Sequence, residues 1–292
     1  MTGFPAYGVE IGGVLSSDRA VWGPPGSGAA LEGDPTIDVT SMLVIAPAET
    51  LTLLPGTVVR LAADQQIFSN GQIIARGTPS LPIVFTSLDP NAGPGTWIAI
   101  TLNSNGYGSA FEYVHINKAY QGISTYLSYP AIRNCLFQSC LEGLSVGIWD
   151  VEDGPAIENN TFLDNMVDGI TSASSIPNIR RNVFRGNTIA VKCTGKFVPD
   201  LGDLDKNNPG ENRFEQSAQY HIFVERISGV IKAEGNIWDA ATAQEMLTKG
   251  YPANILTIYD DWDDDGQLNG SLASVDYYPI AMPTAVREWW IQ

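Results

Sequence analysis

A ten-residue pattern recurs along the middle of the chain and restricts the folds that this sequence can adopt. It occurs at residues 131–140 (AIRNCLFQSC), 156–165 (AIENNTFLDN) and 178–187 (NIRRNVFRGN), with an isoleucine five positions before each phenylalanine. The aromatic position continues beyond these copies, and its members are Phe137, Phe162, Phe184, Phe214 and Trp238. They are 25, 22, 30 and 24 residues apart, so the chain is a series of repeats of about 22 residues.

The position two residues before each aromatic is mostly asparagine. Its members are Cys135, Asn160, Asn182, Asn212 and Asn236, and a second such position holds Cys140, Asn165 and Asn187. A lone buried asparagine costs free energy. Asparagines that recur at one position of a stacked repeat can instead hydrogen-bond to one another and to the backbone. We therefore expect an asparagine ladder.

The repeat length selects the architecture. About 22 residues is too short for a four-stranded propeller blade, and the short apolar runs form no helical stripe. The pattern fits one coil of a parallel β-helix with three short strands, in which equivalent residues stack about 4.8 Å apart. The earlier chain is similar, with turn residues between strands. These strands are expected near residues 43–45, 51–53, 58–61, 72–75, 83–86 and 96–102.

At this point the chain resembles a known family. The segments TLTLLPGTVVRL, GQIIARGTPSLPIVFTS and the I-x-x-N-x-F coils are similar to the right-handed parallel β-helix proteins of the pectate-lyase-like superfamily, in its secreted or surface group. The resemblance spans about residues 36–280. It implies an all-β fold, a single-stranded right-handed parallel β-helix of about nine or ten coils. It does not imply one function, because this fold hosts lyases, hydrolases, epimerases, adhesins and inert stalks.

The ends of such a stack need caps, since an open coil exposes a strand edge and the core. We expect residues 1–35 to form an N-terminal cap, residues 36–239 the coils, and residues 240–292 a C-terminal cap, all within one domain. The last segment combines a short helix at 241–250 that ends at Gly250, a final strand in ILTIYD, an aspartate-rich loop and a tryptophan-rich tail.

The loop DWDDDG, residues 261–266, matches the first half of a calcium-binding loop. Asp261, Asp263 and Asp265 alternate and Gly266 follows, so three carboxylates can turn toward one hard cation. The twelfth position of such a loop is a glutamate, and here it is Leu272. A metal-free polar terminator is the alternative, since the resembling family often ends in a similar aspartate-rich segment. An ion there would stabilise the cap rather than do chemistry, and we expect no organic cofactor.

The charge balance limits the partners. Sixteen Lys plus Arg stand against 32 Asp plus Glu, a net charge of −16, which repels nucleic acid. An acidic polysaccharide would bind only through a local basic patch or a bridging metal. No apolar run is long enough to span a membrane, and MTGFPAYGVE has no signal-peptide pattern. This leaves a cytosolic protein or one whose signal peptide has been removed, and of these we expect an extracellular or cell-surface protein. The three cysteines fit buried thiols or a 135–140 disulfide.

Residues for catalysis are sparse. The hydrolase signatures of the resembling family are not intact, and His115 and His221 are expected to be ordinary surface or cleft histidines. Lyase chemistry needs a carboxylate-bound calcium and an Arg or Lys base. The weak candidates are Arg180, Arg181, Lys192, Lys196, Asp200, Asp203 and Asp205, mostly in the interrupted repeat at 192–212. A solvated insertion and a charge ladder through Glu112, Arg133, Glu158 and Arg180 are the structural alternatives.

Three functions follow from these observations. The first is a non-catalytic extracellular module that is structural or carbohydrate-contacting, since aromatic side chains outside the core can stack on sugars. The second is a lyase or glycoside hydrolase acting on an acidic polysaccharide. The third is a self-assembling subunit, joined through its caps or through Trp289 and Trp290 at the end of the chain.

Overall fold

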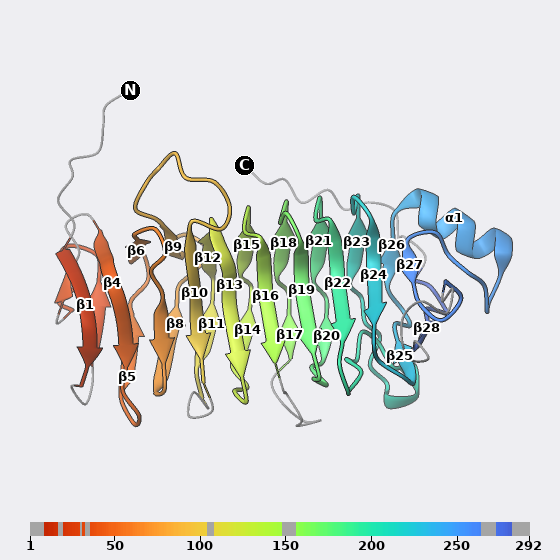
Figure 1. Cartoon of the computed structure of the whole chain (residues 1–292), viewed down its shortest axis with the longest axis horizontal. Helices are drawn as coiled ribbons and strands as arrows, with labels where there is room; N and C mark the ends of the chain where they lie inside the picture. Colours follow the sequence, from red (N-terminus) through yellow and green to blue (C-terminus); the bar gives the residue numbers. More distant parts are fainter. Residues whose placement is uncertain are drawn as a thin grey trace.

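The computed structural model describes residues 9–16, 20–29, 31–32, 36–103, 108–147, 156–263 and 273–281. Its strands stack coil upon coil along one long axis (Figure 1). Each strand of a coil pairs in parallel with the equivalent strands of the coils before and after it. The fold is therefore a parallel β-helix, as the repeat predicts.

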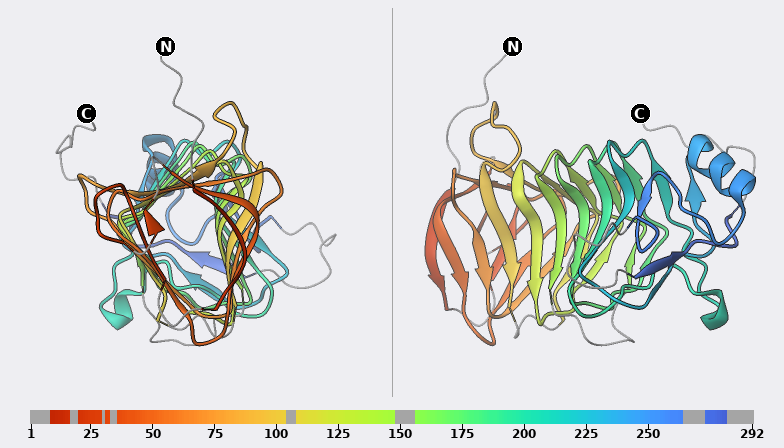
Figure 2. Two further views of the ribbon diagram at one scale, coloured as in Figure 1. Left: turned by 90° about the vertical axis from the view of Figure 1, so that its left-hand side faces the viewer. Right: turned by 45° about the vertical axis from the view of Figure 1, so that its right-hand side comes forward.

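Three faces enclose the core, and they give the stack a triangular outline when it is viewed end-on (Figure 2). Face A contains β1 (Val9–Leu15), β4 (Ile37–Ile45), β7 (Ile67–Ser69), β10 (Trp97–Leu102), β13 (Ala119–Tyr126), β16 (Glu142–Gly147), β19 (Asp168–Ala173), β22 (Ile189–Thr194), β24 (Tyr220–Glu225) and β27 (Ile258–Tyr259). Face B contains β6 (Val58–Leu61), β9 (Ile83–Ser87), β12 (Val114–Asn117), β15 (Leu136–Gln138), β18 (Thr161–Leu163), β21 (Val183–Arg185), β23 (Arg213–Glu215) and β26 (Ile237–Trp238). Face C contains β3 (Leu31–Glu32), β2 (Ala20–Gly23), β5 (Thr50–Leu53), β8 (Gln72–Arg76), β11 (Ala110–Glu112), β14 (Ala131–Arg133), β17 (Ile157–Glu158) and β20 (Ile179–Arg180). The ten strands of face A within the described residues fit the expected number of coils.

The core follows the sequence columns. Phe137, Phe162, Phe184 and Phe214 stack with successive ring centroids 4.9, 5.0 and 5.2 Å apart, and Trp238 continues the stack 4.7 Å beyond Phe214. All four phenylalanines are fully buried. The centroid spacing equals the spacing of parallel strands, so the backbone register itself aligns the rings.

The asparagine ladder is also present. Asn160, Asn182, Asn212 and Asn236 are buried, and each of the last three accepts hydrogen bonds from the asparagine one coil earlier. Cys135 stands at the head of this column and donates its backbone N–H to the side chain of Asn160. All three cysteines are buried and free. Burial raises the pKa of the Cys135 and Cys140 thiols to about 12, so they are inert packing residues.

The two ends of the stack are built differently. Strands β1 and β2 lie within the segment expected as the N-terminal cap, and they pair in register with β4 and β5 of the first coils. At the other end, α1 (Ala240–Lys249) begins at Asp239, whose side chain accepts the Thr242 N–H, and stops at Gly250, which has a positive φ of 77° and donates its N–H to the Met246 carbonyl oxygen. Strands β25 (Val230–Lys232) and β28 (Ser274–Asp276) form a separate pair, and η1 (Leu204–Lys206) lies in the long loop before β23. Among the described residues, no helix has the length and apolar character needed to cross a membrane.

Candidate functional site

Arg180 and Arg181 hold a buried carboxylate. Glu158 is 7% exposed and forms ion pairs with both of them and with Arg133. Glu112, Arg133, Glu158 and Arg180 are direct neighbours in the face C register, so the predicted charge ladder is confirmed. A buried carboxylate needs such partners, so the guanidinium groups of Arg180 and Arg181 have a structural role in neutralising Glu158.

The candidates of the 192–212 loop fall into separate places. Lys192 is on β22, where it pairs with Glu225 at 3.0 Å, and the Lys196 ammonium lies over the Phe197 ring. Asp200 and Asp203 line a hollow of about 230 Å³ together with Lys206 and Lys232. Asp200 also accepts hydrogen bonds from Gly202 N and Asn208 Nδ2. Asp203 caps η1, which contains Asp205. The carboxylates of Asp200 and Asp203 therefore hold the loop in shape.

The aspartate-rich loop is described as far as Asp263, and Asp265 lies outside the described residues. Asp263 accepts hydrogen bonds from Asn254 Nδ2 at 2.9 Å and Asp260 N at 3.2 Å. Asp260 is buried and accepts Val275 N, which ties the loop to β28. Within the described ranges no three His, Cys, Asp or Glu side chains form a metal-binding group. The calcium site at Asp261, Asp263 and Asp265 stays a prediction. Trp289 and Trp290 also lie outside the described residues.

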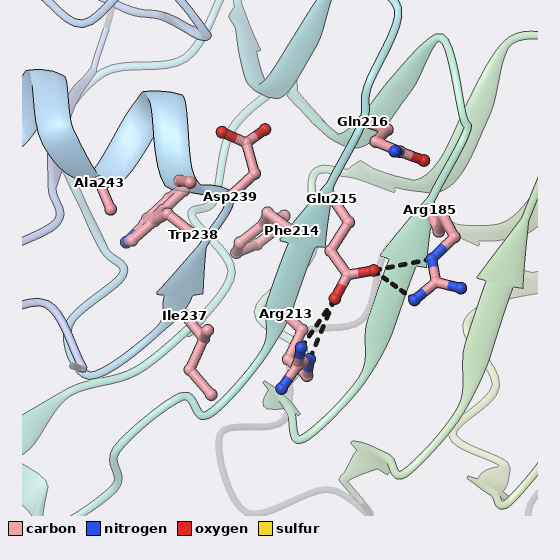
Figure 3. Close-up of a pocket in the computed structure, with 10 residues that line it drawn as sticks. Arg185, Arg213, Phe214, Glu215, Gln216, Ile237, Trp238, Asp239 and Ala243 are labelled. Atoms are coloured by element: carbon pink, nitrogen blue, oxygen red, sulfur yellow. Dashed lines mark hydrogen bonds and ion pairs between the residues drawn. The ribbon is translucent and has the colours of Figure 1, made fainter. Parts of the chain in front are cut away.

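A groove beside the N-terminus of α1, which we call the α1 groove, is the larger of the two hollows described here. Its volume is about 480 Å³. Outward-facing side chains of β21, β23 and β26 form one part of it, and the first turn of α1 forms a wall (Figure 3). The lining residues that matter below are Arg185, Arg213, Glu215, Ile237, Trp238 and Asp239.

Two arginines share one carboxylate in this groove. Arg185 Nε donates to Glu215 Oε2 at 2.7 Å, and Arg213 Nη2 donates to Glu215 Oε1 at 2.9 Å (Figure 3). Burial alone would raise the pKa of Glu215, but the hydrogen bonds from the two arginines hold that pKa below its ordinary value. Both guanidinium groups are half exposed. Glu215 and its two arginines together carry one net positive charge, which the Asp239 carboxylate of the same groove offsets, and the two guanidinium groups keep N–H donors available to a ligand.

The groove also has an apolar surface. Trp238 is 4% exposed, and its indole Nε1 is buried and has no hydrogen-bond partner within the described part of the chain. Ile237 and Ala243 add aliphatic surface. Apolar walls with a few polar groups are typical of small-molecule sites, so this arrangement can hold a ring that carries an anionic group.

Sequence reasoning missed this site and misplaced one histidine. Arg185 and Arg213 were not singled out, although both fall at outward positions of consecutive coils just before the predicted helix. His221 was expected at the surface or in a cleft, but it is 1% exposed. Its hydrogen-bond partner Asp239 was not singled out either.

A second group of polar residues lies on face A. Glu142 and Asp168 are direct neighbours in register, and Gln121 donates to Glu142 at 2.8 Å. Asp168 is 2% exposed, and its Oδ1 lacks a hydrogen-bond partner among the described residues. Burial raises its pKa to about 6. Further along the face, Tyr220, Phe223 and Tyr259 form a cluster of aromatic rings 4.9 to 5.6 Å apart.

The fold places the chain among parallel β-helix proteins. Residues 105–245, a little under half of the 292 residues, match the family described as "Protein of unknown function (DUF1565)". The matched part includes the asparagine ladder and the α1 groove. No curated protein and no solved structure matches the chain.

Proposed function

We propose that this protein is a carbohydrate-contacting β-helix module, located outside the cell or at its surface, that binds an anionic polysaccharide in the α1 groove. The observation that carries the proposal is the pair Arg185 and Arg213, which face the groove in a chain of net charge −16. A chain this acidic repels polyanions over most of its surface. Such a ligand therefore needs local guanidinium donors, and this pair supplies them.

The dimensions and chemistry of the groove support a sugar ligand. A volume of about 480 Å³ suits one or two sugar rings, since ligand pockets usually measure about 300–1,000 Å³. Ile237 and Ala243 offer aliphatic surface to a sugar ring, while guanidinium groups bind carboxylate or sulfate through paired N–H donors. Calcium at Asp261, Asp263 and Asp265 belongs to the proposal as a stabiliser of the nearby cap.

A polysaccharide panel tests the proposal. Carboxylated and sulfated polymers, such as polygalacturonate, alginate and heparin, are compared with neutral dextran and starch by affinity electrophoresis. We expect retardation by at least one anionic polymer, weakening as salt is added because the contact is electrostatic. Retardation by neutral polymers alone, or by none, would contradict the proposal.

A polysaccharide hydrolase is the second candidate, and Asp168 favours it. A buried carboxyl with a raised pKa beside a second carboxyl, Glu142, is the pairing that glycosidases use as acid and base. The aromatic cluster on the same face could support the sugar chain. Reducing-end release from the same polymers, lost in Asp168→Asn and kept in Asp164→Asn, would establish this activity.

A further inference from the structure

Ser217, His221 and Asp239 form a continuous hydrogen-bonded chain at the edge of the α1 groove. His221 Nδ1 lies 2.9 Å from Ser217 Oγ, and His221 Nε2 lies 2.9 Å from Asp239 Oδ2. The Asp239 carboxylate can only accept a hydrogen bond, so the neutral imidazole carries its proton on Nε2 and donates it to Asp239. Nδ1 then accepts a hydrogen bond from the Ser217 hydroxyl. This is the order of nucleophile, base and orienting acid that activates a serine.

The repeat explains how His221 reaches both partners. In the preceding coils the equivalent residues are Gly122, Gly143, Gly169 and Ala190. At β24 the same position holds the long side chain of His221, and this strand lies near α1, the helix that follows β26. The imidazole packs near Phe214 and Trp238, with centroids 5.8 and 6.0 Å away. Burial lowers the pKa of His221, so the ring is neutral at neutral pH and can accept a proton.

Asp239 is held in place for its role. Its Oδ1 accepts Thr242 N at 2.9 Å, which leaves Oδ2 directed at His221. Burial opposes ionisation, but the Thr242 N–H and His221 lower the pKa of Asp239, so it is a carboxylate at neutral pH. Asp239 and Gln216 line the α1 groove, and Ser217, which follows Gln216, is partly exposed.

We propose that Ser217 is a nucleophile for acyl transfer and that its substrate is an O-acyl ester on a sugar bound in the α1 groove. Ser217 and His221 are the catalytic residues, and Asp239 is a positioning residue. The assignment of the nucleophile is independent of the proposed function. Only the choice of a sugar ester rests on it.

The reaction balances without any added oxidant or reductant. Ser217 Oγ bonds to the ester carbonyl carbon while its proton passes to His221 Nδ1. The bond to the alcohol oxygen breaks as that oxygen takes the proton, leaving an acyl-serine. Water then attacks the acyl carbon and gives a proton to Nδ1, which returns it to Ser217 Oγ as the carboxylic acid departs.

The same bonds also fasten α1 to the last coils, so the test must measure reactivity and not only stability. A fluorophosphonate probe is incubated with the full chain, and the labelled residue is located by peptide mass spectrometry. We expect phosphonylation of Ser217, none in Ser217→Ala, and labelling slowed about 100-fold in His221→Gln. Arg76→Ala, an exposed site on face C, should label like the parent. A folded parent that is not labelled at Ser217, or equal rates in parent and His221→Gln, would overturn the proposal.

Two further variants separate activation from folding. Asp239→Asn keeps a side chain that caps helices well but loses the charge, so its melting temperature should stay near the parent while labelling slows by about tenfold or more. In Ser217→Cys the new thiol should react with iodoacetamide at neutral pH about tenfold faster than in Ser217→Cys/His221→Gln. The buried Cys135, Cys140 and Cys193 serve as unreactive internal controls. Equal thiol rates in the two backgrounds would refute the role of His221.

The substrate class has its own measurement. Release of acetate from acetylated pectin or alginate should occur with the parent and stop in Ser217→Ala, while Ser217→Ala still binds the polymer. Labelling at Ser217 without acetate release would support the assignment of Ser217 as the nucleophile and contradict the assignment of a sugar ester as its substrate. Acetate release without a shift in affinity electrophoresis would overturn the proposed function alone.

Discussion

Asn182 receives two hydrogen bonds from Asn160, which lies 22 residues earlier and one coil away. Its Oδ1 accepts the backbone N–H of Asn160 at 2.9 Å and the side-chain Nδ2 at 3.1 Å. Asn182 Nδ2 in turn donates to the carbonyl oxygen of Ile157 at 2.8 Å. Both side chains are at most 1% exposed. The Asn182 side chain thus supplies hydrogen-bond partners to buried backbone groups at a turn between two strands, and its own amide is satisfied by the same bonds.

Asn182→Ala should therefore be costly. The substitution removes the partner of the Asn160 backbone N–H, one of the two partners of Asn160 Nδ2 and a donor to the Ile157 carbonyl, and each buried group left unsatisfied costs about 1–3 kcal/mol. We expect the free energy of unfolding in urea to fall by about 2–4 kcal/mol. Asn91→Ala, in an exposed loop, is the control. A loss at Asn182 no larger than at Asn91 would show that the ladder does not stabilise the coils.

The glycine column should resist even a methyl group. A Cβ at Gly143 would lie 2.7 Å from the carbonyl oxygen of Gly169 and 2.9 Å from Cδ1 of Phe162. Gly143→Ala should lower the free energy of unfolding by about 1–3 kcal/mol, because the overpacked ring and backbone must move. Gly93→Ala, with nothing within 4 Å of its added Cβ, should be close to neutral. Similar urea midpoints for the two variants would contradict this packing.

Asp168 should make stability depend on pH in an unusual direction. Burial raises its pKa from 3.8 to about 6, so the folded chain binds this proton more tightly than the unfolded chain. The stabilisation of the folded state by this bound proton is complete below the ordinary pKa of 3.8 and is lost as the pH rises through about 6. The groups facing it are Glu142, Lys192 and Glu225. Asp168→Asn should match the parent near pH 4 and exceed it by about 2 kcal/mol near pH 8. The reverse order in paired urea titrations would mean that the carboxylate is stabilised by its surroundings.

The calcium prediction is tested by the difference in melting temperature between samples with calcium and samples with chelator. Calcium should raise the melting temperature of the parent relative to chelator, because a ligand that binds only the folded state stabilises it. In Asp263→Ala/Asp265→Ala this increment should vanish. Asp263 also holds Asn254 and Asp260, so the absolute melting temperature should fall in either case. An increment retained by the variant would place calcium elsewhere.

The repeat predicts the fold because its residues act through register. Phe162 and Phe184 share one offset in the repeat, so strand pairing alone stacks them. The α1 groove is not predictable in this way. Arg185 and Arg213 occupy different offsets, and they become groove residues only because α1 lies beside β26. His221 likewise breaks the glycine column, and only the placement of Asp239 at the helix start reveals its second partner. The residues between β22 and Asn212 have no equivalent in the other coils, so the sequence repeat does not predict their contacts.

Calorimetric titration with an anionic oligosaccharide, derived from the polymer that binds most tightly, measures whether the α1 groove is the binding site. The parent, Arg185→Ala, Arg213→Ala and the control Arg76→Ala are compared at one ionic strength. We expect a Kd weaker by about tenfold or more in each groove variant, since a charge-assisted hydrogen bond contributes about 1.5–3 kcal/mol, and an unchanged Kd in Arg76→Ala. Equal Kd values in all four proteins would contradict binding in the α1 groove.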